Sequence, residues 1–393
     1  MAETIEEMDL DQLLSFTETL YEDLNLSYVK EWKEKTGAQA IGYLPVYVPR
    51  EIIHAAGMLP VGIMGGGDNL EIIRGDAFYQ SYICHIPRST IELGLSGRLD
   101  VLDGMLFPAI CDVIRNLSGI WKILFEDRYV KYMDFPQNFK SEIGGKFYMY
   151  ELMDLKAGLE SLGGKEITAH CLRDSIRLYN QNREAVEVLY RLRSDSPHLV
   201  SSFELYLLMR AGNILEVSEH TRLLDRYMDL VIEEDRPKRD YIRVLITGVF
   251  CEQPPASLIR ALEQSGCYIV DDDWMLGARY LLKNVSTSED PFKALTLSYL
   301  YDGIPNASRY IDQEEKGAYL LDRVQKLKAD GVIFAAPSFC DPALLEQPML
   351  QAALDKVEVP HTAFKYSENT GQFQVIKEQT GTFADSIKLW GDQ

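Results

Sequence analysis

The stretch AIGYLPVYVPREIIHAAGMLPVGIM, residues 40–64, decides the fold. An apolar run over 40–49 closes at Pro49, REIIHAAG follows with helical spacing and ends at Gly57, and LPVGIM (59–64) is a second apolar run. Two short, buried-type strands joined by a helix form a strand–helix–strand unit, which favours a parallel sheet. The stretch therefore predicts an α/β fold that begins near residue 40.

Further strands are predicted in two groups, separated by a region of dense charge and helical periodicity. They fall at 104–110 and 129–135, and then at 241–250, 267–273, 331–337 and 359–366. We expect an α/β protein with two Rossmann-like parallel-sheet domains and a helical connector region. The expected divisions are N-terminal helices (1–39), a first α/β domain (40–145), the helical connector (146–238) and a second α/β domain (239–393).

The two halves contain similar segments, GMLFPAICD (104–112) and GVIFAAPSFCDP (331–342). Each has a glycine, an apolar strand with a phenylalanine, a proline-containing loop and then Cys-Asp. This pattern places Cys111 and Cys340 just past the carboxyl ends of strands, where ligands bind in open α/β sheets. Asp112 and Asp341 are expected to cap the helices that follow. The alternative is a coincidence between two buried strands.

A third cysteine, Cys84, lies in SYICHIPRSTIELG (81–94). Pro87 suits the first turn of a helix, so Cys84 is expected just before a helix N-terminus, where the helix dipole favours a thiolate. Thiolate is the form that binds iron. Cys84, Cys111 and Cys340 could thus meet in one interdomain cleft, although core packing or a single reactive thiol would also explain them. No CxxC pair is present, so a zinc-ribbon or bacterial ferredoxin pattern is absent.

The other cysteines are predicted to be structural. Cys171 falls inside a helical stretch, Cys267 begins a strand and Cys251 follows one, which favours core packing for all three. The glycines at 65–67 precede Asp68 and Asn69 and favour a tight turn over a phosphate cradle. The sequence has no P-loop, so any ATP hydrolysis must occur on a partner.

Polar residues next to the cysteines could contribute to chemistry. His85 could donate a proton or pack beside a cluster, and Arg88, Arg115 and Asn116 lie within about one helical turn of a cysteine. The last three could bind the phosphates or thioester of coenzyme A, or could pair with some of the many carboxylates.

Composition excludes several classes of function. The chain has 393 residues, 46% of them hydrophobic, and a net charge of −20, so it would repel nucleic acid. No apolar run reaches the roughly 20 residues that span a bilayer, so no membrane segment is expected. The acidic N-terminus lacks the features of a signal peptide, and we expect a cytoplasmic protein with reduced thiols.

Four segments closely resemble the benzoyl-CoA reductase and 2-hydroxyacyl-CoA dehydratase family. They are IGYLPVYVPREIIHAAGMLPVGIMGGGDN (41–69), YICHIPRST (82–90), FPAICDVIRNLSG (107–119) and APSFCDP (336–342). The resemblance runs from about residue 40 to the C-terminus and is strongest to the C (gamma) subunits of ATP-dependent benzoyl-CoA reductases. It implies that Cys84, Cys111 and Cys340 hold a [4Fe-4S] cluster, alone or joined with another as a double-cubane [8Fe-9S] cluster. The fourth iron of the cluster would then not be bound by a cysteine of this chain.

The resemblance also implies a reaction and its partners. The chain would be the iron–sulfur subunit of an enzyme that dearomatises benzoyl-CoA to a cyclohexadiene-carbonyl-CoA by sequential electron and proton transfers, with His85 as the candidate acid. The implied partners are a homologous cluster-binding B subunit, the ATP-hydrolysing A and D activator subunits, and reduced ferredoxin. The alternatives are a 2-hydroxyacyl-CoA dehydratase subunit or an electron-relay subunit without its own substrate site. Many dehydratase relatives carry Glu-x-Asp where this chain reads FKYSENTGQ (364–372), which disfavours the dehydratase.

Overall fold

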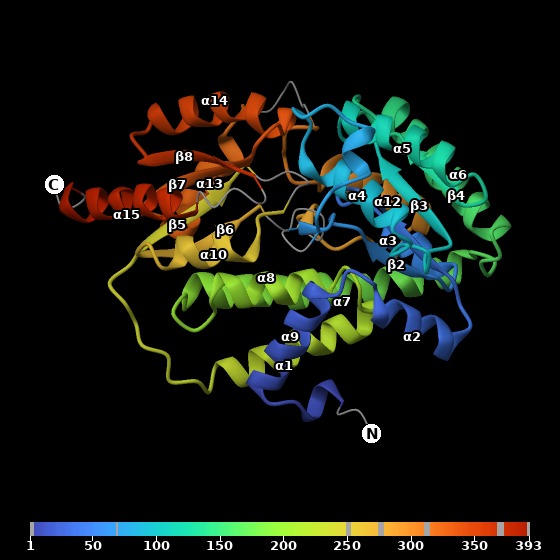
Figure 1. Ribbon diagram of the computed structural model, residues 1–393, viewed down its shortest axis with the longest axis horizontal. Helices are drawn as coiled ribbons and strands as arrows, with labels where there is room; N and C mark the ends of the chain where they lie inside the picture. The colour runs from blue at the N-terminus through green and yellow to red at the C-terminus, as the bar shows by residue number, and fades with distance from the viewer. Residues whose placement is uncertain are drawn as a thin grey trace.

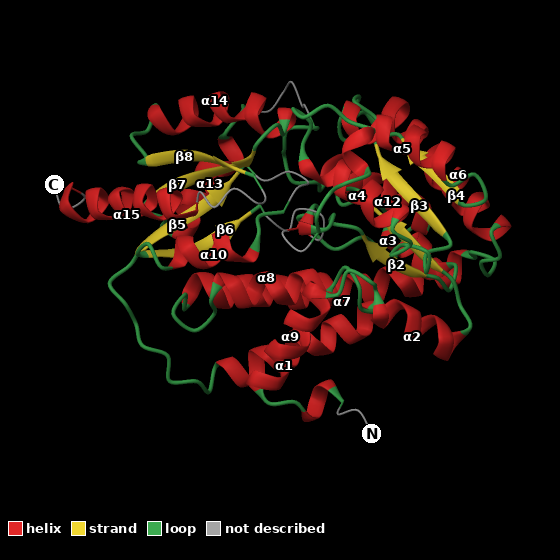
Figure 2. Ribbon diagram, in the orientation of Figure 1, coloured by secondary structure: helices red, strands yellow, loops and turns green. Residues whose placement is uncertain are grey.

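The structure, a computed structural model, describes residues 4–67, 70–248, 253–273, 279–309, 315–367 and 373–390. In these ranges the chain forms two four-stranded parallel sheets flanked by helices, which confirms the predicted fold class (Figures 1 and 2). The first sheet has the order β2 (Leu59–Gly62), β1 (Ala40–Tyr43), β3 (Gly104–Pro108) and β4 (Tyr129–Met133). The second has the order β6 (Cys267–Asp272), β5 (Ile242–Thr247), β7 (Gly331–Pro337) and β8 (His361–Tyr366).

Both sheets follow the same order along their own chain segment, second–first–third–fourth. The direction of winding therefore reverses between the first and third strands of each sheet, which is where open α/β sheets bind ligands. In the first sheet Gly42 of β1 lies opposite Val61 and Met105. A Cβ atom at Gly42 would lie 2.3 Å from Met105 Sδ, so any larger residue here would have to displace the Met105 side chain.

The helices occupy the connections and the region between the two sheets. Their bounds are α1 (Leu10–Glu22), α2 (Ser27–Thr36), α3 (Arg50–Ala55), α4 (His85–Leu95), α5 (Asp112–Leu124), α6 (Lys146–Ser161), α7 (Ala169–Asp195), α8 (Ser202–Ala211), α9 (Val217–Val231), α10 (Ala256–Glu263), α12 (Pro291–Tyr301), α13 (Ala318–Leu327), α14 (Asp341–Asp355) and α15 (Phe373–Trp390), with short helical turns η1 (Ile5–Glu7), η3 (Gly75–Ala77) and η4 (Ser141–Gly145). Across the described ranges, none of these helices combines the length and apolarity needed to cross a membrane.

Helix α7 connects the two sheet domains (Figure 1). Near its N-terminal end, Ser175 Oγ donates a hydrogen bond of 2.8 Å to the carbonyl oxygen of Glu51 in α3. At the middle of the helix, Arg183 forms an ion pair of 2.8 Å with the Glu51 carboxylate. Near its C-terminal end, Arg193 forms an ion pair of 2.7 Å with Asp272 in β6. Because one continuous helix holds both contacts, α7 sets the placement of the second sheet relative to the first.

The first hydrophobic core takes residues from both halves of the sequence. Phe292, Tyr299 and Leu300 of α12 lie in the core of the first sheet, although α12 follows β6 in the chain. The Tyr299 ring packs against Tyr47 and Tyr148 with centroid distances of 5.6 and 4.4 Å. The chain after β6 therefore crosses to the first domain before it returns to β7. The division points predicted at residues 39, 145 and 238 stay a prediction.

Candidate functional site

All three predicted cysteines immediately precede a helix. Cys84 is the N-cap residue of α4, Cys111 of α5 and Cys340 of α14. The prediction that Asp112 and Asp341 cap these helices was wrong, because each helix begins one residue earlier and the cysteine takes the cap position. The two aspartates lie in the first helical turn, where a carboxylate still interacts favourably with the helix dipole.

The three cysteines line one cavity of about 490 Å³, here called the cysteine cavity. Its lining comprises Cys84, Ile110, Cys111, Asp112, Val113, Ala307, Lys316, Phe339, Cys340, Asp341, Pro342, Leu345, Glu346 and Met349. Cys84 and Cys340 are buried and Cys111 is half-buried. Because Cys84 and Cys111 follow elements of the first sheet domain and Cys340 follows β7, the cavity lies between the two domains.

Cys111 and Cys340 occupy equivalent places in the two sheets. Each lies three residues after the end of the third strand, which is Pro108 in β3 and Pro337 in β7. Phe339, beside Cys340, has a φ of 65°, which is unfavourable for a bulky side chain. Backbone strain of this kind persists only where the surrounding structure fixes it, and it is common at functional sites.

The electrostatics of the cavity oppose a free thiolate. Burial raises the pKa of the Cys111 thiol, the backbone N–H groups of Ile114 and Val113 act to lower it, and the nearby Cys340 and Asp112 raise it further. The net shift is upward, so the helix N-terminus alone does not hold Cys111 as a thiolate. A thiolate at this position needs an additional positive partner, such as a metal centre.

The polar groups of the cavity include three thiols, those of Cys84, Cys111 and Cys340. Among the described residues, no three His, Cys, Asp or Glu side chains gather closely enough to hold a single metal ion. Iron–sulfur clusters are held by cysteine thiolates, so three thiols around one cavity fit this kind of group.

The other predicted site residues lie near the cysteines but outside the cavity lining. His85 is buried at the first position of α4. Arg88 forms an ion pair of 2.8 Å with Asp76, and Arg115 and Asn116 are exposed on α5. None of the four lines the cysteine cavity. Their roles in proton transfer and coenzyme A binding stay predictions.

The remaining cysteines lie away from this cavity. Cys267 is buried at the start of β6, as predicted, and Cys171 is in the first turn of α7, where its backbone N–H donates to Thr168 Oγ. Cys251 and the pair Asp68 and Asn69 lie outside the described residues.

A second cavity, of about 360 Å³, lies at the carboxyl ends of β5 and β6. It shares Ala307, Lys316 and Glu346 with the cysteine cavity. Lys316 Nζ lies 2.6 Å from Glu346 Oε1, so an ion pair stands where the two cavities adjoin.

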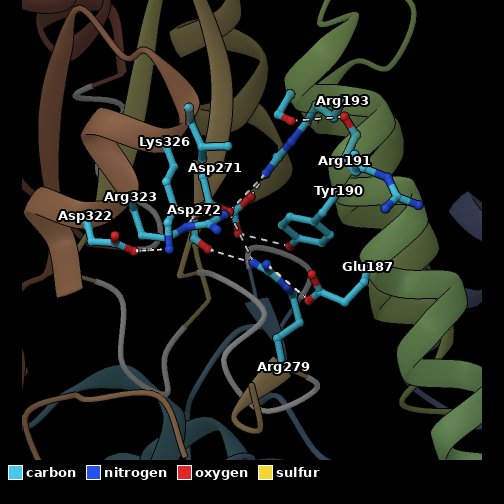
Figure 3. Close-up of polar contacts among 12 residues, drawn as sticks. Glu187, Tyr190, Arg191, Arg193, Asp271, Asp272, Arg279, Asp322, Arg323 and Lys326 are labelled. Carbon is cyan, nitrogen blue, oxygen red and sulfur yellow. Dashed lines mark hydrogen bonds and ion pairs between the residues drawn. The ribbon is translucent and has the colours of Figure 1, made fainter. Parts of the chain in front are cut away.

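Buried charges form one wall of the second cavity (Figure 3). Asp271 pairs with Arg323 at 2.7 Å and with Arg279 at 3.3 Å, and Asp272 pairs with Arg193 at 2.7 Å. Although burial acts to raise it, the pKa of Asp271 is lowered by Arg279, Arg323 and Arg193. We did not anticipate this network from the sequence. The sequence feature that could have revealed the network is the run of three aspartates, 271–273, at the end of an apolar strand, because buried carboxylates require buried cations.

The loop that carries Ala307 between the two cavities is fixed from both sides. The Tyr47 hydroxyl donates to Asn306 Oδ1 at 2.5 Å and lies 2.9 Å from Ser308 Oγ, and burial raises the pKa of Tyr47 to about 12. The buried Arg309 donates to the carbonyl oxygen of Tyr299 at 2.8 Å. These contacts make the partition between the cavities a rigid part of the first core.

Comparisons with known proteins agree with the topology and with the cysteine motifs. The family model of the 2-hydroxyglutaryl-CoA dehydratase D-component matches residues 45–387. The chain is 57% identical over 385 residues to the C subunit of benzoyl-CoA reductase from Thauera aromatica, which covers 98% of this chain and 100% of the relative. It is 29% identical over 357 residues to the beta subunit of (R)-2-hydroxyglutaryl-CoA dehydratase from Acidaminococcus fermentans, covering 89% and 93% of the two chains. It is 26% identical over 360 residues to the (R)-phenyllactyl-CoA dehydratase beta subunit of Clostridium sporogenes, covering 92% and 95%.

Proposed function

Because the chain belongs to the benzoyl-CoA reductase and 2-hydroxyacyl-CoA dehydratase family, we propose that it is the iron–sulfur subunit of an ATP-dependent, ferredoxin-driven benzoyl-CoA reductase. The observation that carries the proposal is the convergence of Cys84, Cys111 and Cys340, each at a helix N-terminus, on one cavity between the domains. The 57% identity to a benzoyl-CoA reductase subunit supports the reductase over the dehydratases, which are 29% identical or less.

In this proposal Cys84, Cys111 and Cys340 each bind one iron of a [4Fe-4S] cluster, whose fourth iron has no cysteine of this chain. When bound, the cluster would supply electrons one at a time at low potential, which the reduction of an aromatic ring requires. The protein contributes three helix N-termini that favour thiolates and a buried setting that limits access of water. The cluster is either separate or joined with that of a partner as a double-cubane [8Fe-9S] cluster.

The proposal assigns the remaining predicted residues to the substrate. His85 is the candidate acid that protonates the ring after electron transfer, since it is buried next to Cys84. Arg115 and Asn116 are exposed on α5 and accessible to the phosphates or thioester of coenzyme A, whereas Arg88 would first have to leave Asp76.

The partners follow from the same proposal. The homologous B subunit would cover the mouth of the cysteine cavity, where Phe339, Leu345 and Met349 line the cavity and are 50, 74 and 45% exposed. Burial of these side chains against a partner is favourable and would exclude water and oxygen. ATP hydrolysis and electron supply belong to the A and D activator subunits and to reduced ferredoxin.

The test is a stoichiometric assay of the anaerobic complex with benzoyl-CoA, reduced ferredoxin and ATP. A reductase forms the cyclohexadiene-carbonyl-CoA and consumes ATP in proportion to product. A dehydratase would instead act on a 2-hydroxyacyl-CoA and need ATP only in catalytic amounts, and that result would contradict the proposal.

The electron-relay alternative is separated by a binding measurement on a Cys84→Ser complex. If this chain only relays electrons, the variant loses electron transfer and keeps full acyl-CoA affinity. If the substrate lies against the cluster of this chain, acyl-CoA affinity falls as well. Cys171→Ser is the matched control, because Cys171 lies at the start of α7 and outside the cysteine cavity.

A further inference from the structure

Tyr79 has a buried hydroxyl group for which the described residues provide no hydrogen-bond partner. The residue lies between η3 and α4, five positions before Cys84, and its ring packs against the first hydrophobic core. Its hydroxyl oxygen is buried and has no hydrogen-bond partner among the described residues. A buried hydroxyl without a partner costs about 1–3 kcal/mol, so an acceptor outside the polypeptide is expected to satisfy it.

The segment that carries Tyr79 is held in place on its N-terminal side. Glu92 Oε2 accepts hydrogen bonds from the backbone N–H groups of Ile73, Arg74 and Gly75 at 2.9, 2.5 and 2.9 Å. The ion pair between Arg88 and Asp76 adds a second anchor. These contacts fix the backbone leading to Tyr79, so the hydroxyl is buried by a defined structure.

The Tyr79 hydroxyl interacts electrostatically with two of the proposed cluster ligands, Cys84 and Cys111. Cys84 belongs to the first hydrophobic core, and Tyr79 and Cys111 both pack against that core. Burial raises the pKa of Tyr79, and the charges of Cys84 and Cys111 raise it further, so both thiols act on the hydroxyl electrostatically. A phenol held neutral in this way is a hydrogen-bond donor over the whole physiological pH range. Its surroundings thus combine a donor without an acceptor and two sulfurs that become negative when they bind metal.

We infer that the Tyr79 hydroxyl donates a hydrogen bond to a sulfur of the cluster held by Cys84 and Cys111, and so tunes its reduction potential. The inference rests on the cluster proposed above. Hydrogen bonds to cluster sulfurs favour the more negative, reduced state and therefore raise the reduction potential. Tyr79 is in this role a positioning residue that acts through the cluster and makes no contact with substrate.

The test compares Tyr79→Phe with Tyr82→Phe in the full anaerobic complex. Both changes remove one hydroxyl from the same loop, but the Tyr82 side chain is 63% exposed, so it serves as the matched control. The cluster of this chain is identified as the electron paramagnetic resonance signal that a Cys111→Ser complex lacks. Redox titration of that signal is expected to give a more negative potential for Tyr79→Phe and the wild-type potential for Tyr82→Phe, with iron and sulfide contents unchanged in both.

A second measurement uses the wild-type complex alone. After exchange into deuterium oxide, electron–nuclear double resonance should detect a deuteron coupled to the reduced cluster, and Tyr79→Phe should lose that coupling. An unchanged potential in Tyr79→Phe, an equal shift in Tyr82→Phe, or a wild-type cluster without a coupled deuteron would each overturn the inference. Each of these results would be compatible with an intact cluster and would therefore refute only the role of Tyr79. A wild-type chain that contains no cluster would instead refute the proposed function.

Discussion

The ion pair between Arg193 and Asp272 provides a quantitative test of how the two domains are held. Both side chains are fully buried, and Arg193 Nη1 lies 2.7 Å from Asp272 Oδ2. At that distance two unit charges attract by about 6 kcal/mol at an effective dielectric constant of about 20, although desolvation of both groups offsets much of this energy. Arg193→Met removes the cation and leaves a buried carboxylate with the weaker hydrogen bond from Tyr190 at 3.2 Å. We expect a loss of about 3–5 kcal/mol in the free energy of unfolding.

The assay is a double-mutant cycle, read by chemical unfolding of the purified protein. Arg193→Met and Asp272→Leu are each expected to be strongly destabilising, because each removes the nearest opposite charge of a buried group. The weaker contacts that remain are Asp271, 4.0 Å from Arg193, and the Tyr190 hydroxyl on Asp272. The combined variant should be more stable than either single variant, since neither charge remains. If the effects of the two substitutions simply add, or if Arg193→Met costs less than about 1 kcal/mol, the reasoning about α7 as the fixed connection is refuted.

Three further perturbations test other parts of the structure. Burial lowers the pKa of His220 from 6.5 to about 4, so the stability that the neutral ring contributes is fully present above pH 6.5. The free energy of unfolding should fall by about 2 kcal/mol on going to pH 5, and unfolding titrations of His220→Gln should lack this component of the pH dependence. Although burial opposes the shift, the pKa of Glu92 is lowered by the N–H groups of Gly75, Ile73 and Arg74. Its contribution to stability is present above about pH 4.5 and is lost as the pH falls through the lower folded value, so Glu92→Gln should speed proteolysis in the 70–84 loop at pH 7, and the difference from wild type should shrink as the pH falls below 4.5. Gly42→Ala should cost about 1–3 kcal/mol through its clash with Met105 and lower the melting temperature, whereas Gly119→Ala, with open space at its Cβ position, should not; equal melting temperatures would contradict the packing argument.

The strands could be predicted because their signal is local. The apolar run at 331–337 coincides with β7, and six of the other predicted strands differ from the observed bounds by one to three residues at an end. The strand predicted at 40–49 was too long, because β1 ends at Tyr43. The similarity between the segments at 104–112 and 331–342 also anticipated that the cysteine-bearing loops occupy equivalent places in two sheets of the same order. The helix caps were wrong by one residue, because Cys and Asp are adjacent and the start of a helix depends on backbone geometry that composition does not fix.

Features that depend on contacts between distant segments could not be predicted in the same way. The crossing of α12 into the first core joins residues more than 150 positions apart, such as Tyr299 and Tyr47. Tyr79 carries no motif, and its importance rests on a hydroxyl that folding buries without a partner among the described residues and that Cys84 and Cys111 influence electrostatically. The charges around Asp271 and Asp272 come from α7, the segment after β6 and α13, so only the assembled fold reveals that they neutralise one another.

The most direct test of the central claim is iron counting combined with ⁵⁷Fe Mössbauer spectroscopy on the anaerobic complex and its single cysteine variants. The wild type should contain the spectrum of one four-iron cluster that is lost or altered when Cys84, Cys111 or Cys340 is replaced by serine. The same spectrum should persist in Cys171→Ser. Unchanged iron content and spectrum in all three cavity variants would show that these cysteines hold no cluster and would contradict the account.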